Sequence, residues 1–459
     1  MQHRFRLPAV LAACTLAALA ATGACTSTSP RPYVHVESIA AHADEPLSPN
    51  DPFWLYGPGT SYWDEQTDDG FPVERPSYGV DAIDAWTHNQ GAGVIVAVVD
   101  TGFNTSSPEL SGHLWTNPAP AFDDLHGANL VAMNGDIADP APPTPPAQAP
   151  TTHPQRPARY GHGTVVAGLI SSVAPQAQLM LLRVSSDSDP TEADGAAVLR
   201  AFTYAVKHGA TVINLSLGSQ SDCSASWGRA IRDAEAHNIV VVAAAGNEQS
   251  EITAPVQHCP TFGDPGTLAA ASITQQGALS WFSNWGSPLV QVAAPGDEME
   301  LPAADGSTWP ESGTSLSSPL TAGVVALVRA ERPQATPAQV VKAITASAYP
   351  LASLTGKVAS GGVVDAVAAL NWIDQADLTA PSPPRQVSPA TFRLRRRSVV
   401  IVRWDASSDN RALVGYRVSI DGRLRATVAP TVLSFSVRLG AGRHSWSVVA
   451  FDDAGNTSG

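Results

Sequence analysis

Residues 94–102 read Val-Ile-Val-Ala-Val-Val-Asp-Thr-Gly, an unbroken apolar run that ends on a carboxylate and a glycine. Further apolar runs of similar length follow along the chain, at 179–184, 212–217, 239–244 and 268–273. Continuous apolar strands, as opposed to alternating ones, are typical of a sheet that is covered on both faces. These runs therefore predict the buried strands of a central sheet.

Helical patterns lie between these predicted strands. Residues 195–208 and 226–237 have helical periodicity, and they end at Gly209 and Asn238, which are common helix stop signals. Strands that alternate with helices are typical of an α/β fold. We expect a mostly parallel sheet with helices on both faces, in which functional side chains follow the carboxyl ends of the strands.

A second folded unit is predicted at the carboxyl end of the chain. The segment Thr-Ala-Pro-Ser-Pro-Pro at 379–384 indicates a stiff linker. Short strand-like runs then follow at 398–404, 415–420, 434–437 and 445–451, separated by turn signals. This spacing predicts a small all-β sandwich. Its pattern of Trp404, Tyr416, Asp421-Gly422 and a closing Asp453-Ala-Gly-Asn456 resembles fibronectin type III modules.

Charge is distributed unevenly along the 459 residues, of which 44% are hydrophobic and 15% charged. From residue 381 onward the chain has 12 Arg and 5 Asp, a net charge of +7. Since the whole chain carries −14, the rest carries −21. An acidic main body argues against nucleic acid as a partner, whereas the basic end suits an anionic cell-wall polymer.

The first residues indicate export. Arg4 and Arg6 precede an apolar run at 7–24 that is crowded with small residues, as in a secretory signal peptide. Residues 22–25, Thr-Gly-Ala-Cys, resemble a bacterial lipoprotein box, which makes Cys25 a candidate for lipidation; cleavage without lipid is the alternative. Membrane contact is expected only through such an anchor, because no later run is long enough to span a bilayer.

These signals divide the chain into five predicted segments: a signal peptide at 1–25, a flexible spacer at 26–48, an α/β catalytic domain at 49–376, a Pro-rich linker at 377–384 and an all-β domain at 385–459. Eight prolines between Asp139 and Pro157 also predict an extended surface insertion within the α/β domain. It is either a solvated loop or a segment that shapes substrate access.

Two motifs supply a carboxylate and an imidazole. Asp100 ends the first buried strand, where it could orient a partner side chain, although many α/β proteins end a strand in this way. His162 lies between two glycines and begins an apolar run at 165–170 that predicts a buried helix. A helix-capping role is the alternative for His162, but flanking glycines let other backbone approach the ring closely.

A third motif supplies a hydroxyl. Residues 313–319 read Gly-Thr-Ser-Leu-Ser-Ser-Pro and lead into a helical run. We expect Pro319 in the first turn of this helix, where its missing N–H is not needed. Ser315 would then lie near a helix N-terminus, whose dipole favours developing negative charge. The alternative is an ordinary serine N-cap.

The order Asp100, His162, Ser315 with these flanks resembles the subtilase family of serine proteases, from about residue 49 to 372. The resemblance implies a subtilisin-like endopeptidase that acts on proteins or peptides outside the cell and needs no cofactor for its chemistry. Ser315 would attack the scissile carbonyl, His162 would transfer the proton, and Asp100 would orient the imidazole.

The resemblance also implies roles for six further residues. Asn247 matches the segment that supplies the oxyanion-hole amide. Two short segments match the substrate-binding walls, and their members are Ser216, Leu217, Gly218, Ala244 and Gly246. Their small, apolar character favours an uncharged substrate side chain.

Cys223 and Cys259 are the pair of cysteines that remains after the leader. Two thiols in an oxidising compartment predict a disulfide, worth about 4 kcal/mol on a chain-entropy basis. Because Cys223 follows the Ser216–Gly218 segment and Cys259 follows Asn247, a bridge would clamp the pocket, as in the mycosin-like subtilases. Two free buried thiols are the alternative.

The chain also departs from the family pattern. Leu316 replaces the usual Met beside the nucleophile, a nearly volume-conserving change. The helix after His162 leads almost directly to Val173-Ala-Pro175, where many relatives insert a calcium-binding loop. No metal site is therefore predicted; structural calcium stays open, with the acidic run 64–69 as one oxygen-rich place.

Two other functions would use the same residues. An esterase or transacylase shares the acyl-transfer chemistry of a protease. A decayed subtilase could act as a cell-surface binding protein through its basic carboxyl end, which includes the cluster Arg393–Arg397. The intact set of Asp100, His162, Asn247 and Ser315 argues against decay, because losing one of them would be the simplest route to it.

Overall fold

The structure is a computed structural model. It describes residues 52–58, 61–64, 73–139, 161–190, 192–218, 225–254, 263–302, 308–375, 377–385, 391–410, 413–452 and 454–458. The predicted leader at 1–25, the spacer at 26–48 and the proline-rich segment after Asp139 lie outside the described residues.

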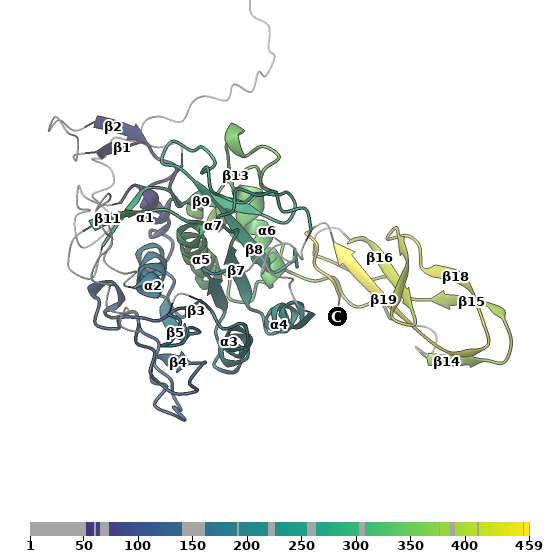
Figure 1. Cartoon of the computed structure of the whole chain (residues 1–459). Helices are drawn as coiled ribbons and strands as arrows, with labels where there is room; N and C mark the ends of the chain where they lie inside the picture. The colour runs from purple at the N-terminus through teal and green to yellow at the C-terminus, as the bar shows by residue number, and fades with distance from the viewer. Residues whose placement is uncertain are drawn as a thin grey trace, which may run out of the picture. The chain divides into compact units, whose positions relative to one another are not determined.

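A nine-stranded sheet forms the centre of the α/β part, with the strand order β12-β13-β9-β8-β7-β6-β3-β5-β4 (Figure 1). Its strands are β3 (Ile95–Asp100), β4 (Gly127–Asn129), β5 (Gln178–Arg183), β6 (Val212–Leu215), β7 (Val240–Ala244), β8 (Thr267–Ile273), β9 (Val292–Pro295), β12 (Tyr349–Pro350) and β13 (Gly362–Val363). All neighbours in this sheet are parallel except β12 and β13. The predicted mostly parallel sheet is therefore confirmed.

The expected strands are found to within about two residues, and the largest difference is at β6. This strand ends at Leu215, two residues before the predicted end. The hydroxyl of the next residue, Ser216, donates a hydrogen bond to the carbonyl oxygen of Ser315 (2.9 Å). The chain therefore turns from the sheet toward another element at Ser216.

Helices cover both faces of the sheet. They are α1 (Ala82–Ala85), α2 (His162–Val173), α3 (Gly195–Lys207), α4 (Ala225–Ala236), α5 (Thr314–Glu331), α6 (Pro337–Ser347) and α7 (Ala366–Gln375). On β6, Ile213 and Leu215 pack into one core cluster with residues of α3 and α4. Asn214 points to the opposite face, where it accepts a hydrogen bond from Ser318 of α5 (2.7 Å). Because both faces of these strands are buried, their sequences are largely apolar and do not alternate with polar residues.

Local signals fix the ends of α3 where the sequence predicts them. Asp194 precedes the helix, and its carboxylate accepts a hydrogen bond from the Ala197 N–H (2.7 Å). Gly209 follows the helix with φ of 76°, a left-handed conformation that glycine adopts without strain. The buried positions of α3 recur at helical spacing, since Ala197, Val198, Ala201 and Ala205 all lie in the core.

The carboxyl-terminal part consists of antiparallel strands around its own core. They are β14 (Thr391–Leu394), β15 (Ser398–Arg403), β16 (Leu413–Ile420), β17 (Arg423–Val428), β18 (Ser434–Leu439) and β19 (Gly442–Asp452). One sheet has the order β14-β19-β16-β17, and β15 pairs with β18 in a second. The core includes Trp404, Tyr416 and Trp446. The predicted all-β character is therefore confirmed.

Two strands of this part, β14 and β17, escaped prediction. β14 has only four residues, and β17 has no fully buried position that would reveal a core-facing side. Two separate antiparallel strand pairs are also present: β1 (Ser61–Asp64) with β2 (Val73–Pro76), and β10 (Met299–Pro302) with β11 (Thr308–Glu311). Within the described ranges, every helix is too short or too polar to cross a membrane.

Candidate active site

Asp100 is the last residue of β3, an interior strand of the sheet between β6 and β5, and it is 2% exposed. Its Oδ1 atom lies 2.7 Å from Nδ1 of His162 and also accepts the N–H of Thr101 (2.7 Å). The buried carboxylate is therefore held by its own turn and faces the imidazole. A hydrogen bond to Nδ1 leaves Nε2 as the nitrogen that can exchange a proton with another group.

His162 is the first residue of α2 and keeps 28% of its side chain exposed. The glycines on both sides have distinct roles. Gly161 has φ of 79°, which lets the chain enter the helix through a left-handed turn. A Cβ at Gly163 would lie 2.3 Å from the carbonyl oxygen of Gly102, so only glycine lets α2 approach the end of β3 this closely. The backbone that comes close here is that of Gly102, and it approaches the start of α2.

Ser315 is the second residue of α5, and Asn247 lies three residues after the end of β7. A Cβ built on Gly313 would lie 3.0 Å from Oγ of Ser315 and 3.7 Å from Nδ2 of Asn247. The hydroxyl and the amide nitrogen therefore flank one small space, which glycine leaves open. The N-terminus of α5 adds the positive end of a helix dipole at this position.

Thr314 orients the Asn247 side chain. Its N–H and its Oγ1–H both donate to Oδ1 of Asn247, at 2.9 Å each. Oγ1 of Thr314 also accepts the N–H of Gly246 (3.0 Å). Because the amide oxygen of Asn247 is occupied in this way, its NH₂ group is directed toward Ser315.

A buried polar network lies beneath Ser315. The helix begins at Thr314, so Pro319 is its sixth residue and not in its first turn, contrary to our expectation. Pro319 cannot donate to the carbonyl oxygen of Ser315, four residues earlier. The hydroxyl of Ser216 donates to that oxygen instead and accepts from Nδ2 of Asn214 (3.0 Å). The side chain of the residue directly after β6 thus satisfies the carbonyl that proline leaves open.

The predicted substrate-binding residues lie around this network, but they differ in how deeply they are buried. Ser216 is buried and its hydroxyl is used by α5, whereas Leu217 is half-buried and Gly218 is exposed. Ala244 is buried at the end of β7. Gly246, with φ of 100°, turns the chain toward Asn247. Cys223 and Cys259 lie outside the described residues, and so does Cys25.

Asp139 is a second carboxylate near this site, and the sequence offered no signal for it. Its Oδ2 atom accepts the N–H of Gly161 (2.6 Å), the residue directly before His162. Burial raises the pKa of Asp139, and the charge of Asp100 raises it further; the Gly161 hydrogen bond and the charges of Arg183 and His162 act in the opposite direction. Since 22 positions separate Asp139 from Gly161, no local pattern could connect them.

Arg183 supports the segment that carries Asp139. It is 1% exposed at the end of β5, beside Asp100 in the parallel register. Its Nη1 donates to the carbonyl oxygen of Ala138 (2.9 Å), and Nη2 binds Asp187. Asn284 supports the other side of the site, because its Oδ1 accepts the N–H groups of Glu248 (3.1 Å) and Ser250 (2.9 Å). Sequence reasoning missed both residues.

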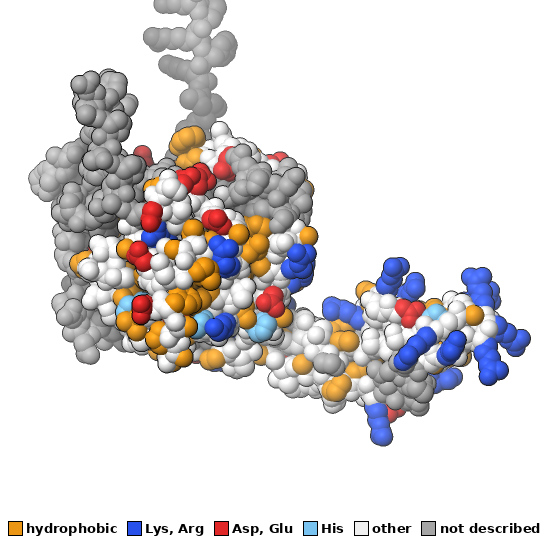
Figure 2. All heavy atoms as spheres, turned by 60° about the horizontal axis from the view of Figure 1, so that its bottom comes forward, with side chains coloured by type: hydrophobic (Ala, Val, Ile, Leu, Met, Phe, Trp, Pro, Cys, Tyr) orange, Lys and Arg blue, Asp and Glu red, His pale blue; other side chains and the backbone are white. Residues whose placement is uncertain are grey.

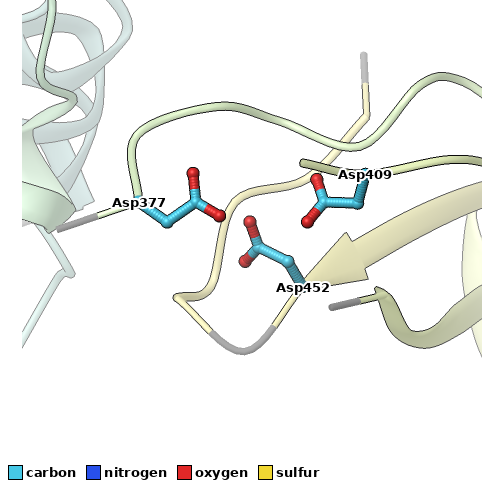
Figure 3. A group of neighbouring side chains, drawn as sticks. All are labelled: Asp377, Asp409 and Asp452. Carbon is cyan, nitrogen blue, oxygen red and sulfur yellow. The ribbon is translucent and has the colours of Figure 1, made fainter. Parts of the chain in front are cut away.

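One group of described carboxylates could hold a divalent cation. Asp377, Asp409 and Asp452 each offer an oxygen, and these oxygens lie within 4.8 Å of one another (Figure 3). The group consists of the first linker residue and two residues of the carboxyl-terminal part, and it includes none of the catalytic candidates. Donors are present too, since Asp377 accepts the Thr379 N–H (3.0 Å) and the Asn410 amide (3.0 Å). The acidic run 65–69 lies outside the described residues, and we assign no metal.

The comparison with known proteins agrees with this geometry. The model of the Subtilase family matches residues 91–377, which is more than half of the chain. The chain therefore belongs to the subtilase family and is a serine protease in class.

Individual relatives cover most of the α/β part. Mycosin-4 of Mycobacterium tuberculosis is 31% identical over 385 residues, covering 74% of this chain and 77% of that protein. A protein named extracellular protease, from Xanthomonas campestris pv. campestris, is 30% identical over 325 residues, covering 64% of this chain and 53% of that protein. A solved protease structure from Pseudoalteromonas arctica PAMC 21717 is 27% identical, with a TM-score of 0.50, and covers 64% of this chain and 94% of that one.

Proposed function

We propose that this subtilase is an exported serine endopeptidase whose catalytic triad is Asp100, His162 and Ser315. The observation that carries the proposal is the 2.7 Å hydrogen bond between buried Asp100 and His162, at the carboxyl end of β3. Ser315 lies near the carboxyl end of the neighbouring strand β6, because its carbonyl oxygen accepts the hydroxyl of Ser216. A carboxylate, an imidazole and a hydroxyl in these positions are the groups that acyl transfer needs. Membership of the subtilase family supports the same assignment.

In the proposed mechanism, Oγ of Ser315 attacks the scissile carbonyl while Nε2 of His162 takes its proton. Asp100 holds the Nδ1–H tautomer and stabilises the imidazolium that forms. The oxyanion of the tetrahedral intermediate would accept hydrogen bonds from Nδ2 of Asn247 and from the backbone N–H of Ser315. His162 then donates the proton to the leaving amine, and water resolves the acyl-enzyme by the same route.

The substrate is proposed to be a protein or peptide with an uncharged side chain in the main pocket. Leu217, Gly218, Ala244 and Gly246 are small or apolar, and no charged side chain occurs among them. A charged substrate group would lose its hydration there without gaining a partner. We keep these residues and Ser216 as the proposed walls, and the Ser216 hydroxyl also binds the carbonyl oxygen of Ser315.

The remaining assignments come from sequence and complete the proposal. The signal peptide would export the chain, and Cys25 would carry a lipid anchor. Cys223 and Cys259 would form a disulfide beside the pocket. The basic carboxyl-terminal domain, which resembles a fibronectin type III module, would bring the enzyme to an anionic cell-wall polymer. The printed name of the Xanthomonas relative supports an extracellular location.

Labelling with a fluorophosphonate probe tests the proposed nucleophile. Wild type, Ser315→Ala and Ser312→Ala would be treated in parallel, and the labelled peptide would be mapped. Ser312 is an exposed serine three residues earlier, which makes it a matched control. We expect labelling of Ser315 in wild type and in Ser312→Ala, and none in Ser315→Ala. Folded wild-type protein that stayed unlabelled would contradict the proposal and favour a decayed subtilase with a binding role.

A further inference from the structure

Three turns of the carboxyl-terminal domain lie at one end of it. They join β14 to β15 at 395–397, β16 to β17 at 421–422, and β18 to β19 at 440–441. The strand registers bring them together, because Leu394 pairs with Gly442, Ser398 with Leu439, and Ile420 with Trp446. We call this region the turn end of the domain.

Eight exposed arginines gather at the turn end: Arg393, Arg395, Arg396, Arg397, Arg423, Arg425, Arg438 and Arg443. Figure 2 shows the corresponding crowding of blue side chains on this domain, with few red ones among them. None of the eight forms an ion pair with a described carboxylate. Their charges are therefore largely uncompensated within the part of the domain that the structure describes, where the charge of Arg425 helps to lower the pKa of Asp421.

The carboxylates of the domain lie mostly at the opposite end. Asp405, Asp409 and Asp452 follow β15 or end β19, away from the three turns. Asp421 is the one described carboxylate at the turn end, and its Oδ2 lies 2.8 Å from Nδ1 of His444. That hydrogen bond lowers the pKa of Asp421 and raises that of His444. The carboxylate nearest the arginines is thus already engaged.

The placement of the arginines is unfavourable without an external anion. Arg393 and Arg443 are direct cross-strand partners, and like charges in such pairs destabilise a sheet. Arg395, Arg396 and Arg397 are consecutive in one turn. A phosphate group has oxygens on more than one side and can bridge two guanidinium groups. A carboxylate commonly uses both of its oxygens to bind a single guanidinium group.

The shape of the cluster favours a flexible partner over a flat one. Arg393 points outward from one sheet, because its strand neighbours Phe392 and Leu394 face the core, and Arg443 is its cross-strand partner on the same face. Arg438 points outward from the other sheet, since Val437 and Leu439 face the core. A bilayer could meet only one of these faces or the tip between them. A flexible chain can pass over the turns and reach both faces.

Nucleic acid is a poorer match than a simple polyanion. Single-stranded nucleic acids are usually held by aromatic side chains on which the bases stack. Among the described residues of this domain, no aromatic side chain is exposed. The surface therefore offers charge without a stacking platform.

We propose that the turn end of the carboxyl-terminal domain binds a flexible, phosphate-bearing polymer of the cell envelope. This inference rests on the proposed export of the chain, but not on its peptidase activity. The arginines at the three turns hold successive phosphates, and the opposite, acidic end of the domain stays away from the polymer.

Binding of purified poly(glycerol phosphate) tests the surface. The full chain would carry Ser315→Ala throughout, so that self-cleavage does not interfere. The test variant is Arg395→Gln/Arg396→Gln/Arg397→Gln, and the matched control is Arg229→Gln/Arg232→Gln/Arg403→Gln, which removes the same charge from exposed arginines elsewhere. Kd would be measured by titration between about 50 and 200 mM salt, a range over which phosphate contacts weaken strongly.

We expect the test variant to raise Kd by at least about 10-fold, and to reduce the slope of log Kd against log salt by roughly 2, since each lost contact on a flexible polyanion removes roughly 0.7. The control variant should bind as the parent does. Equal weakening by both variants would overturn the proposal, because it would show diffuse attraction.

Other outcomes would also overturn it: no binding of the polymer by the parent chain, or tighter binding to phosphatidylglycerol vesicles or to DNA than to the polymer. The same triple substitution with Ser315 restored should leave kcat/KM for a short peptide unchanged. That measurement separates failure of this surface from failure of the proposed peptidase.

Discussion

At the scale of single residues, two carboxylates serve His162 in different ways. Asp100 binds the imidazole itself, whereas Asp139 binds the backbone N–H directly before it. Burial raises the pKa of Asp139, so the folded protein binds its proton more tightly than the unfolded chain does. The stability of the fold therefore falls as pH rises from the unfolded pKa of Asp139 toward its raised folded value.

Two substitutions of Asp139 should distinguish the effect of its hydrogen bond from the effect of its charge. Asp139→Asn keeps an oxygen that accepts the Gly161 N–H and removes a negative charge, so we expect near-wild-type kcat and unchanged or higher stability at neutral pH. The pKa of His162 should fall, which moves the acid limb of the kcat/KM profile to lower pH. Asp139→Ala also loses the acceptor, and kcat should drop about 10-fold as the His162 turn loosens.

The measurements for Asp139 are a pH profile with a peptide substrate and urea unfolding of all three proteins. Asp233→Asn, an exposed carboxylate on α4, is the control for loss of charge alone. If Asp139→Ala folded normally and kept the wild-type kcat and pH profile, Asp139 would have no positioning role.

Thr314 should matter for the rate and not for binding. Thr314→Val is nearly isosteric but removes the hydroxyl that holds Oδ1 of Asn247 and the Gly246 N–H. The amide that faces the oxyanion would lose its orientation, so we expect kcat to fall about 10-fold with KM little changed. Thr314→Ser keeps the hydroxyl and should recover most of the rate. Steady-state kinetics check this, and a rise in KM at constant kcat would contradict it.

At the scale of elements, α5 depends on a contact from another element. A proline at the sixth position of a helix removes one backbone hydrogen bond, and here a serine from the end of β6 replaces it. Ser318 continues the same link, because it donates to Asn214 of β6. Ser315, the candidate nucleophile, therefore lies on a helix whose first turns are hydrogen-bonded to β6 and to the residue that follows β6.

Removal of this link should destabilise the fold. Ser216→Ala leaves the carbonyl of Ser315 and the amide of Asn214 without a buried partner, which costs about 1–3 kcal/mol. Adding Pro319→Ala to that variant supplies an N–H that can donate to Ser315, so part of the loss should return. Urea unfolding of the two single variants and the double variant measures this. Strictly additive losses would show that Pro319 and Ser216 are not coupled.

At the scale of the whole molecule, the chain has separate cores. The core that contains Trp404 and Tyr416 draws only on residues from 392 onward, and the clusters of the α/β part draw on none of them. A unit with its own core can fold alone. The charge follows the same division, since the carboxyl-terminal part is basic and the rest is acidic.

Truncation after Gln375, the end of α7, should therefore separate two activities. We expect the shortened chain to keep kcat/KM for a short peptide within about two-fold, because all the proposed catalytic residues lie in the retained part. Its binding to poly(glycerol phosphate) should disappear. Peptidase assays and polymer titration on the same preparation check both statements; loss of peptidase activity in a chain that still unfolds cooperatively would argue against independent function.

Much of the fold and the candidate site follows from local sequence. Continuous apolar runs require a covered sheet, and β3, β5, β7 and β8 lie where those runs are. Asp100, His162 and Ser315 could be picked out because each sits in a short motif that contains glycine, and Gly161 supplies the left-handed turn directly before His162. Such signals depend on a few neighbouring positions, so they survive in the linear sequence.

Only the tertiary structure decided how these motifs are supported. Asp139 and Gly161 are 22 positions apart, Asn247 and Thr314 are 67, and Ser216 and Ser315 are 99. No local pattern encodes such pairs, because their energy depends on how separate strands and helices pack. The turn end arises likewise, since its arginines come from different strands and become neighbours only through antiparallel pairing. Sequence by itself determined the layers and the residues proposed to react, whereas packing between distant segments decided their supports and the charged surface.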